Sequence, residues 1–245
     1  MLTLRDIEQP SKDLIKSMKS IIHFTSEFEV LATILSTKSL KLYYCKEDFY
    51  LGNRRVSSAV HPMISFSEYF VKSINKKKIT YGKFGIGFKK AWVSKNKLHP
   101  VLYVDNTSLI AASLADLLKA RRKNATSKLA TNIRLAIMTI KCFTKNSNGY
   151  NSYFKVEDFD FKSENEWRYV PTKKQIDGKL ISQSKSKYLA KPDYYNNQLN
   201  KFFLKFSVAD IEVIFVSTEK QRQVIADLIS IESDKILISK WTTQL

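Results

Sequence analysis

The chain has 245 residues, of which 44% are hydrophobic and 26% are charged, with 6 Gly and 5 Pro. This composition predicts a globular chain and excludes a collagen-like or disordered one, so we expect a single domain over 1–245. Two cysteines and three histidines are too few for a disulfide scaffold or a cysteine-based zinc site, and we expect no metal.

The N-terminal residues are polar, and no stretch approaches the ~20 apolar residues of a membrane-spanning helix. We therefore expect a cytoplasmic protein without a membrane partner.

Positive charge is concentrated in one third of the chain. The net charge is +18, and residues 71–150 hold 17 basic and 2 acidic side chains. This asymmetry favours a polyanion or an acidic protein as partner, and the alternative is a solvated basic surface.

The N-terminal half predicts strands around one capped helix. Residues 1–20 are expected to form a helical arm, and 21–24 a strand. Ser26 and Glu29 have the spacing of a capping box for a helix that ends near residues 36–38. Strands are predicted at 40–44, 63–67, 81–88 and 101–104, with a loop at 45–62.

The C-terminal half begins with two helices and returns to strands. Residues 108–143 have helical periodicity with a break near Asn124, and they carry many basic residues. Strands are predicted at 166–170, 202–206 and 211–216, followed by a helix at 219–231. The fold class is therefore α+β, with a split, mostly antiparallel sheet and a basic helical insertion at 108–145.

The glycine-rich segment 82–87 is not a nucleotide phosphate loop, because it lacks the Gly-Lys-Ser/Thr ending. Its alternation of glycine with apolar residues predicts a strand against which another group packs closely. Cys142 falls on the apolar stripe of a predicted helix, as a buried structural cysteine does.

Two carboxylates at the entrance of the 166–170 strand are the first catalytic candidates. Glu164 and Glu166 are two residues apart, so on a strand both project to one side and can share a substrate. The alternative is an exposed acidic strand end paired with Lys162 or Arg168.

A histidine at the end of the first strand is the second candidate. His23 precedes a predicted helix, where its ring can hydrogen-bond a ribose hydroxyl, and a structural histidine is the alternative.

Five motifs in this order resemble the AbiGi group of abortive phage infection proteins. They are His-Phe-Thr at 23–25, Ser-Phe-Ser at 65–67, YGKFGIGF at 81–88, Pro-Val-Leu-Tyr at 100–103 and Glu-Asn-Glu-Trp-Arg at 164–168. The pattern is also similar to that of ADP-ribosyltransferases, whose split-sheet fold binds NAD in a cleft.

That second resemblance implies a set of roles. Glu166 would be the catalytic glutamate, and Glu164 would act on the incoming nucleophile. The NAD-binding residues would be His23, Phe24, Thr25, Ser65, Ser67 and Tyr81.

Together these features predict a phage-defence toxin that transfers ADP-ribose from NAD to a nucleic acid, with RNA favoured. The nucleic acid would bind at Lys76, Lys77, Lys78, Arg121, Arg122 and Lys123. Such a toxin implies a neutralising antitoxin, with a chaperone as a further candidate partner. The alternatives are a non-enzymatic antitoxin or nucleic-acid-binding module, and a ribonuclease that uses His23 or His61.

Overall fold

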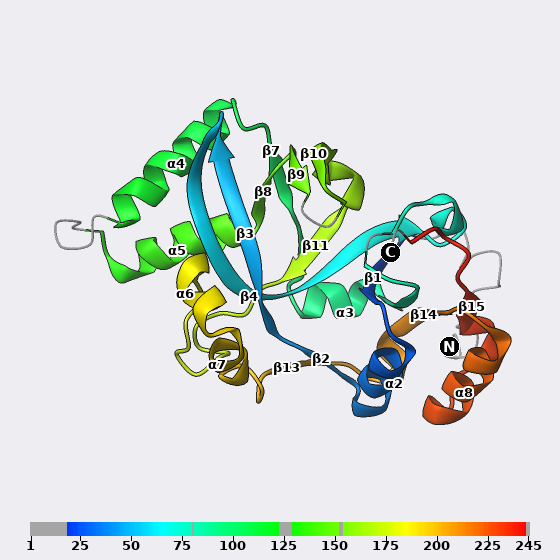
Figure 1. Cartoon of the computed structure of the whole chain (residues 1–245). Helices are drawn as coiled ribbons and strands as arrows, with labels where there is room; N and C mark the ends of the chain where they lie inside the picture. Colours follow the sequence, from blue (N-terminus) through cyan, green and yellow to red (C-terminus); the bar gives the residue numbers. More distant parts are fainter. Residues whose placement is uncertain (1–18, 80, 123–128, 152–153, 244–245) are drawn as a thin grey trace, which may run out of the picture. The chain divides into compact units, whose positions relative to one another are not determined.

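The computed structural model describes residues 19–79, 81–122, 129–151 and 154–243 (Figure 1). The chain separates into two compact units. Unit 1 comprises the described parts of Met1–Lys38, Glu68–Val93 and Phe206–Leu245. Unit 2 comprises Ser39–Ser67 and the described parts of Ser94–Lys205. The single domain expected for 1–245 stays a prediction.

The sheet of unit 1 has the strand order β15-β14-β5-β1, in which β14 and β15 are parallel and the other neighbours antiparallel. The strands are β1 (Lys19–Thr25), β5 (Phe84–Phe88), β14 (Ile211–Val216) and β15 (Ile236–Ile238). The helices are α2 (Phe28–Thr37), α8 (Glu219–Ile229) and the 3-10 turns η1 (Ile74–Lys76), η3 (Val208–Asp210) and η4 (Ser233–Lys235). Helix α3 (Lys90–Lys95) begins in unit 1 and ends in unit 2.

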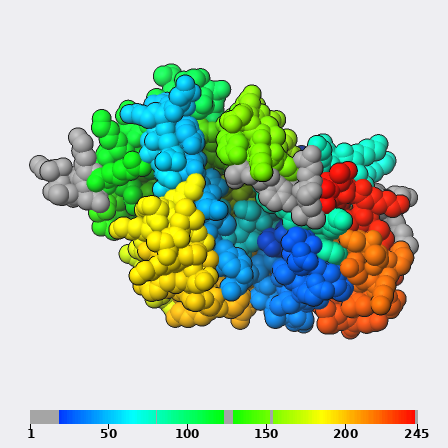
Figure 2. Space-filling model, viewed as in Figure 1, coloured from blue at the N-terminus to red at the C-terminus, as the bar shows by residue number. Residues whose placement is uncertain are grey.

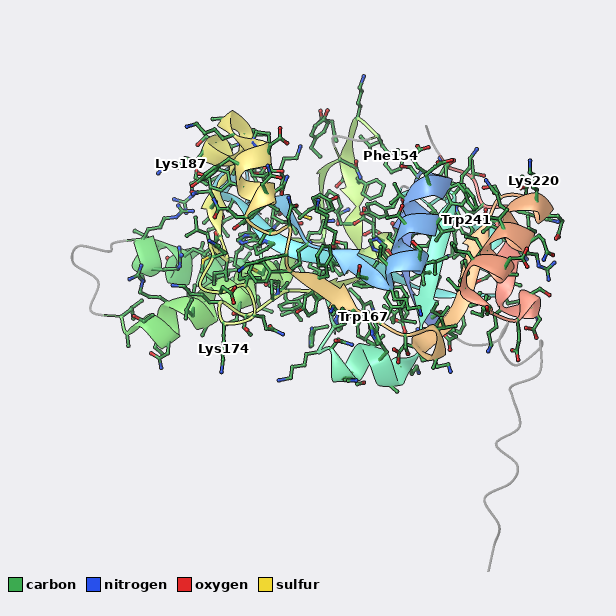
Figure 3. All side chains as sticks on the ribbon, turned by 90° about the horizontal axis from the view of Figure 1, so that it is seen from below. Phe154, Trp167, Lys174, Lys187, Lys220 and Trp241 are labelled. Atoms are coloured by element: carbon green, nitrogen blue, oxygen red, sulfur yellow. The ribbon has the colours of Figure 1, made fainter. Side chains whose placement is uncertain are left out.

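The core of unit 1 gathers around Trp241, which is labelled in Figure 3. Its ring meets those of Phe24 and Phe215 edge to face, with centroids 5.7 and 5.1 Å apart, and its indole N–H donates to the carbonyl of Gly82 at 2.9 Å. This contact ties the last described residues to the centre of the unit, because a buried indole needs a partner for its N–H.

The glycine-rich strand is as tightly packed as its sequence predicts. A Cβ atom on Gly87 would lie 2.4 Å from Ser20 Oγ, and one on Gly85 would lie 2.9 Å from Ile22 Cγ2. Both distances are too short for a side chain, so glycine lets β1 and β14 approach β5 on either side.

Two expectations for the start of unit 1 are wrong. The N-cap of α2 is Glu27, without a side-chain capping bond, so Ser26 does not cap the helix. The helix begins one residue later than the capping box requires, which leaves Ser26 outside it. Residues 1–18 of the expected arm lie outside the described residues, and Lys19 and Ser20 are strand rather than helix.

Unit 2 has the strand order β4-β11-β6, with β3 and β12 also pairing with β4. These strands are β3 (Tyr43–Leu51), β4 (Arg54–Phe70, in unit 2 up to Ser67), β6 (His99–Pro100), β11 (Glu166–Tyr169) and β12 (Gln183–Ser184). Three further pairs are β2 (Ser39–Lys41) with β13 (Phe203–Lys205), β7 (Leu102–Val104) with β8 (Thr144–Asn146), and β9 (Asn148–Asn151) with β10 (Val156–Asp160).

The helices of unit 2 are α4 (Leu109–Arg122), α5 (Thr131–Cys142), α6 (Lys185–Ala190), α7 (Pro192–Asn197) and the 3-10 turn η2 (Phe161–Glu164). Helices α4 and α5 confirm the predicted helical pair and pack on a core that includes Phe49 of β3. Figure 2 shows α6 and α7 in yellow beside the light-blue β3–β4 hairpin, which α7 contacts.

The loop predicted at 45–62 is wrong, because these residues form the antiparallel β3–β4 hairpin. The turn uses Gly52, whose φ of +55° lies in the left-handed region that glycine adopts without strain. The charged residues Glu47 and Asp48 of β3 are paired with Arg168 and Lys185 of other elements.

The fold class is confirmed at the level of a mixed α+β chain whose strand pairs are mostly antiparallel. The predicted strands at 63–67 and 211–216 lie within β4 and β14. The predicted strand at 166–170 contains β11, and the predicted helix at 219–231 contains α8.

Candidate functional site

A buried cluster of charged side chains in unit 2 surrounds Glu166. Strand β11 pairs with β4 so that Glu166 lies opposite Ser67, and Arg168 opposite Ser65. The side chain of Arg168 is completely buried, while Glu164 and Glu166 are each 5% exposed. The pairing of Glu166 with Arg168, which the sequence left open, is therefore present, but inside the protein rather than at an exposed strand end.

Glu166 is the centre of the hydrogen bonds in this cluster. Its carboxylate accepts from Arg168 Nε at 2.7 Å and Nη2 at 3.0 Å, and from Lys145 Nζ at 3.2 Å. Ser65 Oγ donates to Glu166 Oε1 at 3.0 Å. The backbone N–H of Glu166 donates to Tyr103 OH at 2.9 Å. These donors hold the side chain in one orientation.

Glu164 and Glu166 both contact the amine of Lys145, although they do not project from one strand face as expected. Glu164 ends the 3-10 turn η2, and Asn165 has a φ of +44°, so the two glutamates are not successive residues of one strand face. Lys145 Nζ nevertheless lies 2.7 Å from Glu164 Oε2, and also 4.4 Å from the centre of the Phe161 ring. One ammonium group is thus shared by two carboxylates.

The charges in this cluster keep each other ionised. Burial raises the pKa of Glu166, but Arg168 and Lys145 outweigh burial and bring it down to about 2. Burial lowers the pKa of Lys145, and the attraction of Glu166, Glu47 and Glu164 raises it above its usual value. At neutral pH Glu166 is therefore a carboxylate beside the cations Lys145 and Arg168, since a nearby opposite charge favours the charged form.

Arg168 links the cluster to strand β3 and to the end of helix α5. Its Nη2 donates to Glu47 Oε1 at 2.7 Å, and its Nη1 donates to the carbonyl of Cys142 at 2.6 Å. Cys142 is buried, as its place on the helix predicts, and burial raises its pKa to about 12. The thiol is therefore protonated and not a nucleophile at neutral pH.

The other predicted site residues lie in both units. Ser65 and Ser67 are in unit 2 beside Glu166, whereas His23, Phe24, Thr25 and Tyr81 are in unit 1. His23 lies opposite Ile86 in the β1–β5 pair, and the Phe24 ring is buried in the core. A shared NAD cleft of His23 and Glu166 stays a prediction.

The predicted nucleic-acid-binding residues are also divided. Lys76, Lys77 and Lys78 are exposed in unit 1, whereas Arg121 and Arg122 end helix α4 in unit 2. Lys123 lies outside the described residues. Arg122 Nη2 donates to the backbone carbonyl of Val56 at 2.5 Å.

Sequence reasoning missed Lys145 and Glu47, because each is defined by partners that are distant in the chain. Lys141 could have been recognised in the sequence, because it is a lysine at the helical position where Ile137 and Met138 predict an apolar residue. The structure shows that its side chain is completely buried. His61, the second histidine considered for a ribonuclease, is also completely buried.

A hollow of about 580 Å³ lies on unit 2 beside the charged cluster around Glu166. It is lined mainly by apolar side chains: Val101, Leu102, Tyr103, Val104, Ile110, Leu114, Ile140, Thr144, Lys162 and Asn165. Tyr103 belongs both to this lining and to the bonds around Glu166. The hollow therefore borders the charged cluster.

Among the described residues, no group of three or more His, Cys, Asp and Glu side chains is arranged to hold a metal ion. None of the described helices has both the length and the apolar character needed to cross a membrane.

Comparison with known proteins identifies the family of the chain. No curated protein and no solved structure matches the chain significantly. A family model described as "Putative abortive phage resistance protein AbiGi, antitoxin" matches residues 38–217, which include Glu164, Glu166 and the helices α4 and α5. The chain therefore belongs to the AbiGi family of abortive phage resistance proteins.

Proposed function

We propose that this chain is the antitoxin of an abortive-infection pair and that it inactivates a toxin protein by binding it directly. The proposal rests on the apolar hollow of unit 2, and the family description, which includes the word antitoxin, supports the same role. The partner contact is placed at the hollow, between helices α4 and α5 and strand β7.

The hollow has the chemistry of a protein contact. Three of its side chains are unusually exposed for their type: Ile110 at 66%, Leu102 at 48% and Ile140 at 46%. A cluster of exposed apolar side chains beside a concave surface is typical of an interaction site. Its contact with a partner would remove this apolar surface from water.

The positive net charge of the chain favours an acidic partner. The net charge is +18, and Lys162 lies in the lining of the hollow. A second copy of the chain would be repelled, whereas an acidic toxin surface with apolar side chains matches both properties.

Growth assays test the antitoxin role. The chain is induced alone, and then together with the toxin encoded beside it in its source genome. We expect normal growth in the first case and rescue from the toxin in the second. Growth arrest by the chain alone would sink the proposal.

Matched variants test the surface. Ile110→Glu with Ile140→Glu should abolish rescue, because both place charge in the apolar contact. Leu189→Glu on α6 is the control, since Leu189 is 54% exposed and lies outside the hollow. Equal rescue by all three proteins would show that the contact lies elsewhere.

A second candidate function is ADP-ribosyl transfer, and it is favoured by the contact of Ser65 with Glu166 and by the amine that Glu164 and Glu166 share. A place that holds an ammonium between two carboxylates also stabilises a positive charge that develops on a sugar.

In this candidate, Lys145 would leave and the ribose of NAD would take its place. The bond between ribose and nicotinamide breaks, and its electron pair leaves with nicotinamide. Glu166 would stabilise the cation on the anomeric carbon, with Ser65 holding one carboxylate oxygen. An acceptor atom then forms the new bond and releases its proton to Glu164.

Release of nicotinamide from NAD tests this candidate. The full chain is incubated with labelled NAD, with and without total RNA, beside Glu166→Gln and Glu164→Ala. Transfer requires label on RNA that Glu166→Gln abolishes, while Glu164→Ala retains NAD hydrolysis. Absence of nicotinamide release from the wild-type chain would exclude the activity.

A further inference from the structure

Unit 2 holds four buried basic nitrogen atoms without a hydrogen-bond partner in the described part of the chain. They are His61 Nε2, Arg121 Nε, Arg134 Nε and Lys141 Nζ. Among the described residues, eight buried side-chain atoms lack a partner, so these basic groups make up half of them. Buried polar groups in native proteins are normally bonded, and an unpaired buried cation is especially unfavourable.

These four side chains come from elements that share one core. Arg121 lies one turn after the buried Leu118 of α4, and on α5 Arg134 and Lys141 lie two turns apart on the face of the buried Ile137. His61 belongs to β4, and its Nδ1 contacts the carbonyl of Ile181 at 3.2 Å. The cations therefore point toward the packed side of the α4–α5 pair.

The four groups are electrostatic neighbours. Burial is the main cause that lowers the pKa of His61 to about 3, and the charges of Lys141, Arg168 and Arg121 lower it further. Burial, Arg134 and Arg122 together hold the pKa of Arg121 below its usual value. The charges of Arg121 and Arg134 thus repel each other in the absence of a counterion, and the surrounding positive charge keeps His61 neutral at neutral pH.

The nearest carboxylates do not supply that counterion. Glu47 Oε1 is bonded to Arg168 at 2.7 Å, and Asp48 Oδ2 is bonded to Lys185 at 2.7 Å. Asp48 Oδ1 is buried and itself lacks a hydrogen-bond partner among the described residues, so it does not bond Lys141. The ammonium of Lys141 lies 5.6 Å from the centre of the Phe49 ring, which is a weak interaction beside a full negative charge.

We infer that His61, Arg121, Arg134 and Lys141 form a binding site for a phosphate group. Hydrogen phosphate carries the missing negative charge and offers acceptor oxygens to Arg121, Arg134 and Lys141, which come from two helices. Its P–OH can donate to Nε2 of His61, which is an acceptor because the neutral ring has its proton on Nδ1, toward the carbonyl of Ile181. Arg121 and Arg134 are half-buried and form the outer end of the site, whereas His61 and Lys141 are completely buried and form its inner end. The inference does not depend on either proposed function, because none of the four residues lines the hollow or contacts Glu166 in the bonds described above.

Thermal unfolding of the full chain tests the site. Inorganic phosphate at 10 mM should raise the Tm by several degrees over sodium chloride of equal ionic strength, since a ligand that binds only the folded state stabilises it. Lys141→Met should abolish this shift and leave the Tm in phosphate-free buffer unchanged or higher, because it removes an unpaired buried cation. A merely structural lysine would instead lower the Tm in both buffers.

A second variant keeps the test decisive if Lys141→Met does not fold. Arg134→Gln changes a half-buried residue and should reduce the phosphate shift at least threefold, whereas Lys201→Gln, at an exposed ion pair, should leave it unchanged. Absence of a phosphate shift in the wild-type chain, or an equal shift in all variants, would overturn the inference.

Competition identifies the source of the phosphate group. A single-stranded RNA 12-mer and AMP are each titrated into the phosphate-bound chain by calorimetry. Displacement of phosphate by RNA, lost in Arg134→Gln, assigns the site to a polynucleotide backbone. Displacement by AMP alone assigns it to a small phosphate ester.

Discussion

Replacement of Arg168 by methionine tests how much the buried charged cluster contributes to stability. The guanidinium makes four hydrogen bonds of 2.6 to 3.0 Å, two to Glu166, one to Glu47 and one to the carbonyl of Cys142. Arg168→Met would leave Glu47 without its partner and Glu166 with Lys145 as its remaining cation.

The expected loss is large because the charges are buried. Removal of one member of a buried ion pair costs about 3–5 kcal/mol. In a chain of this length each kcal/mol lowers the Tm by about 2–4 °C, so we expect a decrease of roughly 10 °C. Lys201→Met is the matched control: its pair with Asp177 is exposed, with side chains 66% and 60% accessible, and such pairs contribute about 0–1 kcal/mol.

Guanidinium chloride unfolding followed by tryptophan fluorescence measures both variants. Adding Glu47→Gln to Arg168→Met should recover about 1 kcal/mol or more, since it removes a carboxylate left without its partner. If Arg168→Met and Lys201→Met lie within 1 kcal/mol of each other, the charged cluster does not stabilise the fold as argued.

Three further predictions follow from buried groups and close contacts. Because the folded-state pKa of His61 is about 3 and the ordinary value 6.5, the unfolded state takes up its proton first as the pH falls; in phosphate-free buffer the free energy of unfolding should decrease by about 2 kcal/mol from pH 6.5 to 4.5, and His61→Gln should flatten this profile. Gly82→Ala should destabilise the chain more than Gly52→Ala in urea unfolding: both glycines have positive φ, but only at Gly82 would a Cβ meet backbone, 2.1 Å from the carbonyl oxygen of Thr25. Cys142 is buried and burial raises its pKa to about 12, so iodoacetamide at pH 8 should label it in guanidinium chloride and not in the native chain, as mass spectrometry would show; rapid native labelling would contradict this.

The sequence predicted elements where local periodicity decides the structure. The strand predicted at 81–88 and the helical pair predicted within 108–143 depend on apolar spacing within each segment. The structure has β5 at 84–88 and helices at 109–122 and 131–142. The β3–β4 hairpin was missed, and one of the contacts that hold it, between Glu47 and Arg168, joins residues 121 positions apart. A partner so far along the chain leaves no local signal.

The candidate site was predictable in part for the same reason. The spacing of Glu164 and Glu166 is visible in the sequence, and the two carboxylates do meet. Lys145, which they share, stands on a short strand with no motif of its own. The phosphate site was indicated only by Lys141, a charged residue on an apolar helix face, because the unpaired state of its neighbours appears only after packing.

The ribosome completes the residues of unit 2 before those of unit 1. Unit 2 has its last residue at Lys205, whereas unit 1 still lacks β14, the neighbour of β5 in its sheet. Until residues 211–216 emerge, β5 presents an unpaired edge, and the hydrophobic side chains of its Phe84–Phe88 segment lack part of their cover. An unpaired strand edge of this kind invites pairing with other chains. Newly made chains are therefore open to aggregation, and to a holding chaperone, until residues 211–216 have emerged and paired with β5.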